Sequence, residues 1–510
     1  MKLSLRIIAV LAALLMLVSI VACGNTGNGD TTTTAAAQTS ADADSTDTGD
    51  PSSPSNVDAQ GFLLDDLPTN LNYGGKEITV LAWKDVEHEE FEADADGDIV
   101  LNSIFERNKA VEKQLGVTIS YIRIDGDSDY RKDWDAYVAN NVGNTSHEFD
   151  IIAGYSLSVA LDCVNGYLYN MLDSECKYLD FDKPWWSSLL IDQATIHNKL
   201  YFASGDISRN ALEMMYVCYC NTLLLDNHHL ENPQNFVESG DWTYEKFIEM
   251  CQGIYSDTDG DGKKSASKDT GDTFGYMCSG IHNDPWFYGT GATICEKDAD
   301  GNIIPSSSFF GEKVGNTVAM LQSLFYTSND GIYTSSVYHQ RAFGDGRLLL
   351  MTERARVSHK ILAAEYGFTD FVILPCPKYD KDTEKYITVM GNPFTLYAIP
   401  ADTQDPTLAS AFIESFASQG YRKVTPAVFE LSLKSRYSFD STSSKMYDMI
   451  RENLTYDIGR IFSGSLIGQG TFRDALAKPG IIWGPTAKNV EQKLKTLSGT
   501  LNTNFLEKLN

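Results

Sequence analysis

Apolar residues in the first third of the folded part of the chain recur with two different periods. Short apolar runs predict buried strands. They occupy residues 77–81, 117–121 and 149–153. Asp98 precedes apolar positions at helical spacing, and Gly116 follows Leu115, which predicts a capped helix that ends there. A second helix is expected around Trp134. This alternation predicts a parallel, doubly wound α/β sheet, in which ligands bind beyond the carboxyl ends of the strands.

The later part of the chain also alternates strands and helices, with longer elements. Strands are expected at residues 214–219, 371–374 and 394–399. Helices are expected at residues 243–254 and 312–328, and along the apolar stripe of residues 490–505. Ile294 and Ile303 flank an acidic turn, which predicts a hairpin. Trp185 and Trp186 are assigned to packing within a lobe.

The N-terminus carries the pattern of an export signal. Lys2 and Arg6 precede an apolar run that ends at Ala22, and this run is too short and wrongly flanked to cross a membrane. Residues 1–22 are therefore predicted to be a signal peptide. The ending Val21-Ala22-Cys23 resembles a bacterial lipobox, which implies cleavage after Ala22 and acyl chains such as palmitate on Cys23. An ordinary cleaved signal with an unrelated cysteine is the alternative.

Composition separates a linker from a folded body. Residues 23–61 are predicted to be a disordered tether, because residues 24–60 contain no Leu, Ile or aromatic side chain. The roughly 450 residues that follow are too many for one compact core and indicate two or more lobes. The net charge of −28 argues against nucleic acid as a partner.

The cysteines do not predict a disulfide framework. Of nine cysteines, Cys23 is assigned to the lipid and eight remain. Their spacing is scattered, and Cys218 and Cys220 are poorly placed for a bridge within one strand. We expect most of the eight to be small buried hydrophobic residues. No CxxC pair and no Cys/His cluster suggests a zinc site.

Several segments, in order, resemble a known family. They are Tyr73-Gly74-Gly75-Lys76-Glu77-Ile78-Thr79-Val80, residues 149–152 followed by 166–168, residues 182–186, 199–203 and 241–247, and Phe343-Gly344-Asp345-Gly346-Arg347. Their order and spacing are similar to those of the bacterial extracellular solute-binding proteins of carbohydrate ABC importers, the group that includes maltose-binding protein. The resemblance covers nearly all of residues 72–510.

The resemblance implies a two-lobed clamshell that closes by a hinge on its ligand. The N-terminal lobe would comprise residues 62–208 and 370–420, and the C-terminal lobe residues 209–369 and 421–510. It implies a monomeric, extracytoplasmic protein that passes an oligosaccharide to a membrane permease, with no required cofactor and no bond made or broken. The ligand is left open, because a peptide or a polyamine also fits the sequence.

Candidate ligand-binding residues follow from the chemistry of sugars, which present apolar ring faces and hydroxyl groups to aromatic and short polar side chains. Strand-end loops supply Trp83, Asp85, Tyr155 and Ser156, and the aromatic run 284–288 supplies Trp286 and Tyr288. Gly391 and Asn392 follow a predicted crossing, and Trp483 resembles in place an aromatic that stacks on sugar in the family. For each tryptophan, the alternative is an ordinary place in the core.

One segment resembles a calcium-binding loop. Asp257, Asp259 and Asp261 alternate before Gly262 and Lys263, which matches the start of an EF-hand loop. The twelfth position is Lys268 where the EF-hand has Glu, although Asp269 or Asp272 would serve in a longer loop. The segment therefore predicts a structural Ca²⁺ site, with a plain Asp/Gly-rich turn as the alternative.

Enzymatic motifs do not emerge from the sequence. There is no HExxH, no G-x-S-x-G and no Walker loop, and the S-x-x-K match at residues 265–268 lies in a polar loop where chance accounts for it. Asp and Glu are abundant, so the paired carboxylates of a glycosidase keep an enzyme among the alternatives. A surface glycan-binding adhesin without transport and a lipid-anchored glycoside-active enzyme are the alternatives to a binding protein.

Overall fold

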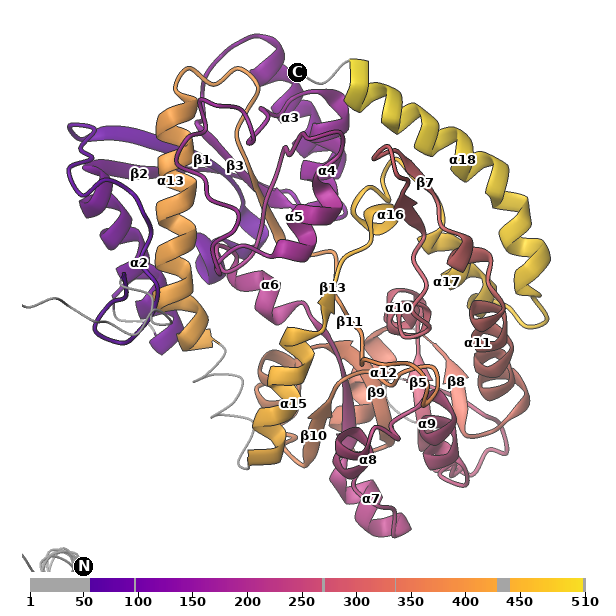
Figure 1. Cartoon of the computed structure of the whole chain (residues 1–510). Helices are drawn as coiled ribbons and strands as arrows, with labels where there is room; N and C mark the ends of the chain where they lie inside the picture. The colour runs from indigo at the N-terminus through magenta and orange to yellow at the C-terminus, as the bar shows by residue number, and fades with distance from the viewer. Residues whose placement is uncertain (1–55, 96–97, 268–270, 335, 429–440, 508–510) are drawn as a thin grey trace, which may run out of the picture. The chain divides into compact units, whose positions relative to one another are not determined.

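The computed structural model describes residues 56–95, 98–267, 271–334, 336–428 and 441–507 (Figure 1). The described residues from Asn56 onward form one compact unit. The predicted signal peptide, Cys23 and most of the predicted linker lie outside the described residues. Within the described part, no helix is both long enough and apolar enough to span a bilayer.

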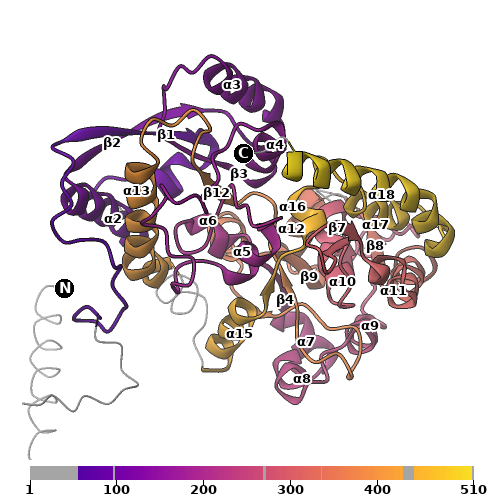
Figure 2. The ribbon, with the colours of Figure 1, turned by 45° about the horizontal axis from the view of Figure 1, so that its top comes forward.

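The first sheet has the strand order β12-β3-β1-β2. Its strands are β1 (Lys76–Trp83), β2 (Val117–Ile124), β3 (Ile151–Tyr155) and β12 (Thr395–Ala398). β1 is parallel to β2 and β3, whereas β12 runs antiparallel to β3. The helices α2 (Ile99–Leu115), α3 (Arg131–Gly143), α4 (Ser156–Asn165) and α13 (Pro406–Gln419) accompany this sheet (Figures 1 and 2). The predicted parallel core is confirmed, with one antiparallel strand added at its edge.

α2 follows its predicted boundaries. The Asp98 carboxylate accepts hydrogen bonds from the backbone N–H groups of Val100 and Leu101, which satisfies two otherwise unpaired donors of the first turn. Gly116 adopts a left-handed conformation at φ 63° and ends the helix. Its buried face packs on α13, which is far away in the chain. The hydroxyl of Ser415 in α13 donates to the side chain of Gln114 in α2, across 301 positions.

The second sheet has the strand order β10-β4-β9-β5-β8. Its strands are β4 (Tyr216–Asn221), β5 (Phe274–Cys278), β8 (Gly331–Tyr333), β9 (Leu348–Arg354) and β10 (Phe371–Leu374). β4 runs antiparallel to β9 and β10, whereas β5 is parallel to β8 and β9. Its helices include α7 (Thr222–His228), α8 (Pro233–Ser239), α9 (Tyr244–Cys251), α11 (Glu312–Gln322) and α12 (Ser336–Gly344). Each sheet with its helices forms one lobe.

The predicted lobe boundary at residue 370 is wrong. β10 lies in the second sheet, because it pairs with β4, and the chain crosses to the first sheet only between β10 and β12. On this crossing, β11 (Thr388–Val389) pairs with β13 (Leu454–Thr455), and α6 (Arg209–Glu213) lies on the earlier crossing. An apolar run identifies a strand but does not show which sheet completes its hydrogen bonds.

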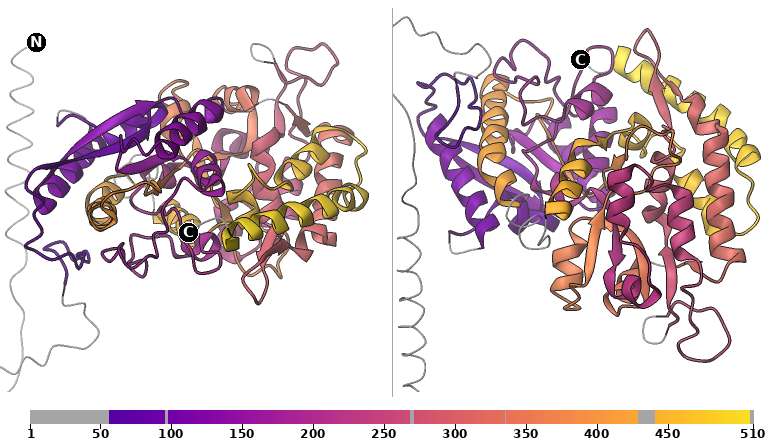
Figure 3. Two further views of the ribbon diagram at one scale, coloured as in Figure 1. Left: turned by 90° about the horizontal axis from the view of Figure 1, so that it is seen from above. Right: turned by 60° about the horizontal axis from the view of Figure 1, so that its bottom comes forward.

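The remaining elements complete the C-terminal lobe. Short elements include η4 (Gly280–Asn283), α10 (Asp284–Tyr288), the hairpin strands β6 (Cys295–Lys297) and β7 (Ile303–Pro305), and η5 (Ser307–Phe310). α15 (Ser441–Glu452), α16 (Ile458–Ile461), α17 (Gln469–Ala477) and α18 (Trp483–Glu507) follow. The long yellow helix α18 packs against α11, α17 and β7 (Figure 3). The hairpin and the terminal helix confirm two predictions.

The eight cysteines of the body are all buried and free, which confirms that they act as small apolar side chains.

Candidate functional site

The carboxyl edge of the first sheet presents Tyr155 and Ser156, where β3 leads directly into α4. α3 packs closely here, because a Cβ on Gly154 would lie 2.5 Å from the Trp134 ring. The Tyr155 ring is 5.6 Å from that of Trp83, and its hydroxyl makes no hydrogen bond to any described residue. The Ser156 hydroxyl donates to the carbonyl of Asn392 at 2.5 Å. Tyr155 is 4% exposed, so this edge holds a buried phenol whose hydroxyl has no hydrogen bond to the described residues.

A charged cluster in the C-terminal lobe centres on Asp284, the first residue of α10. Its carboxylate accepts from Arg460 Nη1 at 2.5 Å, from Arg473 Nε at 2.7 Å and from Gln469 Nε2 at 3.1 Å. Asp284 is 2% exposed. These charge-assisted bonds join α10 to α16 and α17 and set the direction of both guanidinium groups.

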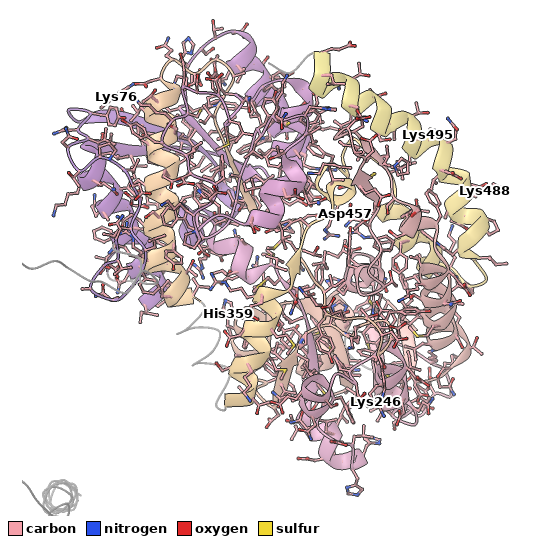
Figure 4. All side chains as sticks on the ribbon, viewed as in Figure 1. Lys76, Lys246, His359, Asp457, Lys488 and Lys495 are labelled. Atoms are coloured by element: carbon pink, nitrogen blue, oxygen red, sulfur yellow. The ribbon has the colours of Figure 1, made fainter. Side chains whose placement is uncertain are left out.

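Asp457 forms a second anchor in the same region (labelled in Figure 4). Its carboxylate caps α16 through the N–H of Gly459 and accepts from the N–H of Ile294 and from the hydroxyl of Tyr288, at 2.7 to 2.9 Å. Burial raises the pKa of Asp457, and these donors oppose the rise. Asp457 thus connects α10, the hairpin and α16.

Residues of both lobes line more than one cavity, and the cavity beside Tyr155 is small, at about 20 Å³. Its lining includes Ser156 and Asn392 from the first lobe and Asp457 and Arg460 from the second. Burial raises the pKa of Tyr155, and the positive charges of Arg131, Arg460 and Arg473 oppose this rise, so the phenol lies in the field of arginines from both lobes. We call this region the lobe junction. A cavity of this size fits about one water molecule and no sugar ring.

A larger groove of about 900 Å³ lies elsewhere, between α18 and the β6–β7 hairpin. Lys488 and Lys495 line it and are labelled in Figure 4. All of its lining residues come from the C-terminal lobe. We favour the lobe junction over this groove, because a site shared by both lobes couples ligand binding to their relative movement.

The predicted site residues of the first lobe lie near the junction, but most are already engaged. Trp83 is 1% exposed and its indole N–H donates to Thr395 Oγ1 at 3.0 Å. The Asp85 carboxylate accepts from the N–H of Gly126 at 2.9 Å. Gly391 allows the side chain of Arg354 to approach closely, because a Cβ on this residue would lie 3.1 Å from Cδ of Arg354. Tyr155 is therefore the predicted residue best placed to meet a ligand.

The structure places Trp286 and Trp483 in the core, where their faces are covered. Trp286 is 1% exposed, packs among Tyr244, Phe247 and Tyr276, and donates its indole N–H to the Tyr276 hydroxyl. Trp483 is 2% exposed and donates to the carbonyl of Phe309. Neither presents a ring face to a sugar, because both rings are buried in the core, where their large apolar surfaces are removed from water. The hydroxyl of Tyr288 is held by Asp457.

The arginines of the junction were missed by the sequence analysis. Asp284 heads the aromatic run that drew attention, yet its partners Arg460 and Arg473 lie 176 and 189 positions further on. No local pattern marks such a cluster. The one available signal was the acidic residue at the start of that run.

The predicted calcium loop is compact and partly rearranged. Carboxylate oxygens of Asp257, Asp259 and Asp272 lie within 4.8 Å of one another. Asp272 is buried and accepts from the N–H groups of Thr258 and Ser265, whereas Asp257 accepts from two glycine N–H groups of the loop. The Asp261 carboxylate accepts from the Lys263 N–H, and the Asp261 N–H donates to the carboxylate of Asp259. Oxygen-rich loops of this kind fit Ca²⁺, and calcium stays a prediction.

Comparison with known proteins gives consistent results. The family described as bacterial extracellular solute-binding protein matches residues 106–421. No curated protein sequence matches the chain. Similar solved structures include the GacH receptor of Streptomyces glaucescens, at 15% identity over 83% of this chain and 99% of that chain with a TM-score of 0.53.

Two further structures show the same likeness. The ABC substrate-binding protein Lmo0181 of Listeria monocytogenes is 14% identical over 83% of this chain and 99% of that chain, with a TM-score of 0.53. The galacto-N-biose/lacto-N-biose I-binding protein of Bifidobacterium longum is 12% identical over 86% and 99%, with a TM-score of 0.52. At these identities the likeness establishes a two-lobed fold. With a family match over more than half its length, the chain belongs to the bacterial extracellular solute-binding proteins.

Proposed function

We propose that this protein captures an oligosaccharide between its two lobes and delivers it to an ABC-type permease. The observation that carries the proposal is the lobe junction, where Tyr155 of the first lobe lies in the field of Arg460 and Arg473 of the second. Phenol and guanidinium groups are suitable hydrogen-bond partners for sugar hydroxyls. Structures of the same fold hold lacto-N-biose and maltotetraose, which supports a sugar as the ligand class.

The proposed mechanism is a hinge movement. The cavity at the junction, about 20 Å³, is too small for a sugar ring, so a ligand requires the lobes to separate and then close around it. Closure gives the ligand contacts to both lobes, which shifts the population toward the closed form. The crossings at α6 and at β11–β13 are the segments that would bend.

The first test is a binding screen. The purified chain is heated with each member of a panel of oligosaccharides, peptides and polyamines. A sugar at one hundred times its dissociation constant should stabilise the folded state by about 2.7 kcal/mol, which raises the melting temperature. Small-angle X-ray scattering should show a smaller radius of gyration with the same sugar. A response to peptides or polyamines alone would contradict the sugar proposal.

A matched pair of variants locates the site. Tyr155→Phe keeps the ring and removes the free hydroxyl, so the affinity for the sugar should fall by about tenfold, the equivalent of one hydrogen bond. Tyr130→Phe removes a hydroxyl from a side chain that is 44% exposed and should leave the affinity unchanged. Equal affinities for Tyr155→Phe and the unchanged chain would place the ligand elsewhere.

Membrane anchoring through Cys23 is part of the proposal. Cys23→Ala removes the sulfur that would carry the lipid, so the protein should move from the membrane fraction to the medium or the periplasm. Retention of the variant in the membrane fraction would contradict a lipid anchor.

Transport is distinguished from the alternatives by uptake. Cells that lack this protein should lose uptake of the labelled sugar and regain it with the unchanged chain. Binding without any effect on uptake would favour a glycan-binding adhesin. Shortening of the sugar by the purified chain would favour an enzyme.

Calcium binding is proposed at Asp257, Asp259 and Asp272. Ca²⁺ should raise the melting temperature of chelator-treated protein, and Asp259→Asn should remove that rise while leaving sugar binding in place. No response to Ca²⁺ in the unchanged chain would identify a plain turn.

A further inference from the structure

Three metal-binding side chains meet inside the C-terminal lobe, away from the predicted calcium loop. They are His282 in η4, His339 in α12 and Glu353 in β9, and each is 0% exposed. One ligand atom from each lies within 4.8 Å of the other two. Oε2 of Glu353 is 2.8 Å from Nε2 of His282 and 3.3 Å from Nε2 of His339.

Hydrogen bonding leaves this cluster incomplete. Nε2 of His282 lies close to the carboxylate but lacks hydrogen-bond geometry, and it has no other partner among the described residues. Nδ1 of His339 is also buried and has no partner in the described part of the chain. Unpaired polar atoms in the interior destabilise the folded state by about 1–3 kcal/mol each. A cation placed among the three side chains would accept the lone pair of His282 Nε2.

The outer atoms of the cluster are held by a second layer of contacts. Nδ1 of His282 is 3.0 Å from the hydroxyl of Ser279, and Oε1 of Glu353 accepts from Arg354 Nε at 2.8 Å. Gln340 Nε2 also donates, at 2.6 Å, to Oε2 of Glu353, which is the oxygen that faces both histidines. Zinc ligands in proteins are oriented by contacts of this kind.

We propose that His282, His339 and Glu353 bind one Zn²⁺ ion. Two imidazole nitrogens and one carboxylate oxygen form an established zinc ligand set, with bond lengths of about 2.0–2.2 Å that hold tetrahedral ligand atoms about 3.3 Å apart. The His282–Glu353 and His339–Glu353 distances of 2.8 and 3.3 Å require only small side-chain rotations. Because Arg354 shares the single carboxylate, the affinity should lie below that of sites with two anionic ligands.

The ion would stabilise the C-terminal half of the lobe junction. It would join η4, α12 and β9, of which η4 and β9 are already linked by the bond from the Thr352 hydroxyl to the carbonyl of His282. His282 lies two residues before Asp284, and Glu353 directly precedes Arg354, so the ion would fix both charged residues in place. The zinc proposal does not depend on the identity of the solute, and it stands or falls separately from sugar binding.

The test uses the full-length chain with an affinity tag that contains no histidine. The protein is treated with a chelator, dialysed, incubated with ZnCl₂ and freed of excess metal. Mass spectrometry of the metal should then find one zinc per chain, and the melting temperature should rise above that of the metal-free protein. Co²⁺ in place of Zn²⁺ should give the visible absorption of a tetrahedral site.

Variants assign the ion to the cluster. His282→Gln and Glu353→Gln should lower the zinc affinity by about 100-fold or more, and Ser279→Ala, which only orients His282, by about tenfold. His228→Gln changes an exposed histidine, and Asp259→Asn changes the predicted calcium loop, so both should retain zinc. Circular dichroism checks that each variant is folded.

Two results would overturn the proposal. In the first, the unchanged chain retains no zinc and its melting temperature does not change with Zn²⁺ or Co²⁺. The cluster is then a hydrogen-bonded carboxylate between two imidazoles. If folded His282→Gln and Glu353→Gln keep the affinity of the unchanged chain, the metal binds elsewhere. The first result is measured on the unchanged chain, so it tests the proposal even if a variant misfolds.

Discussion

The surroundings of two buried carboxylates, Asp284 and Glu414, stabilise them in opposite ways. Both are 2% exposed. Asp284 in the C-terminal lobe accepts from the guanidinium groups of Arg460 and Arg473. Glu414 in α13 of the N-terminal lobe accepts from the neutral indoles of Trp185 and Trp186, each at 3.1 Å, and from the N–H of Asp180.

The difference lies in how the negative charge is stabilised. Two cations compensate the charge of Asp284, and the resulting cluster faces the lobe junction. Burial raises the pKa of Glu414 to about 8, because indole and amide donors only partly oppose the loss of water. A buried carboxylate therefore joins charged elements in one lobe, and in the other it serves as a largely protonated support for two tryptophans at neutral pH.

The largest expected effect comes from Asp284→Asn. The change leaves two guanidinium groups without their carboxylate, so the free energy of unfolding should fall by about 3–5 kcal/mol. Chemical denaturation monitored by tryptophan fluorescence measures this loss. Asp474→Asn, at an exposed position of α17, should change the stability by less than about 0.5 kcal/mol. Equal stabilities for the two variants would show that the arginine contacts of Asp284 do not contribute to the free energy of unfolding.

An intermediate effect is expected from pH through Glu414. Its pKa is raised above the unfolded value, so the folded state binds the extra proton and stability is lost as the pH rises toward about 8. Between about pH 5.5 and about pH 8.5, this group should lower the free energy of unfolding by about 3 kcal/mol. Denaturation at several pH values measures the slope.

Glu414→Gln isolates that contribution, because an amide does not titrate in this range. The difference in slope between the unchanged chain and this variant should equal the contribution of Glu414. Glu452→Gln, at an exposed position, should keep the original slope. A Glu414→Gln variant with the slope of the unchanged chain would show that Glu414 titrates normally.

The smallest effect is expected from Trp186→Phe. The change removes one indole donor from Glu414 and should lower the stability by about 1–2 kcal/mol. That donor lowers the pKa of Glu414, so its removal should move the pH-dependent loss to higher pH. Trp242→Phe removes an indole N–H that donates to the carbonyl of Pro375, and its pH profile should stay in place.

Local pattern was sufficient for most elements and insufficient for most of the site. Asp98 and Gly116 marked both ends of α2, because a cap and a left-handed terminus depend only on neighbouring residues. Tyr155 was predicted as a site residue because strand ends lie beside ligands in this kind of sheet, and its role stays a prediction. Trp286 was assigned to the site because a stacking platform and a core tryptophan look alike in sequence.

The sequence alone determined the export signal as a prediction, the alternation of strands and helices, and the resemblance to solute-binding proteins. Only the tertiary structure decided that β10 completes the second sheet, that Asp284 meets Arg460 and Arg473, and that His282, His339 and Glu353 converge although no zinc spacing marks them. Elements follow from periodicities of a few residues, whereas sheet partners and buried polar clusters depend on packing between segments far apart in the chain.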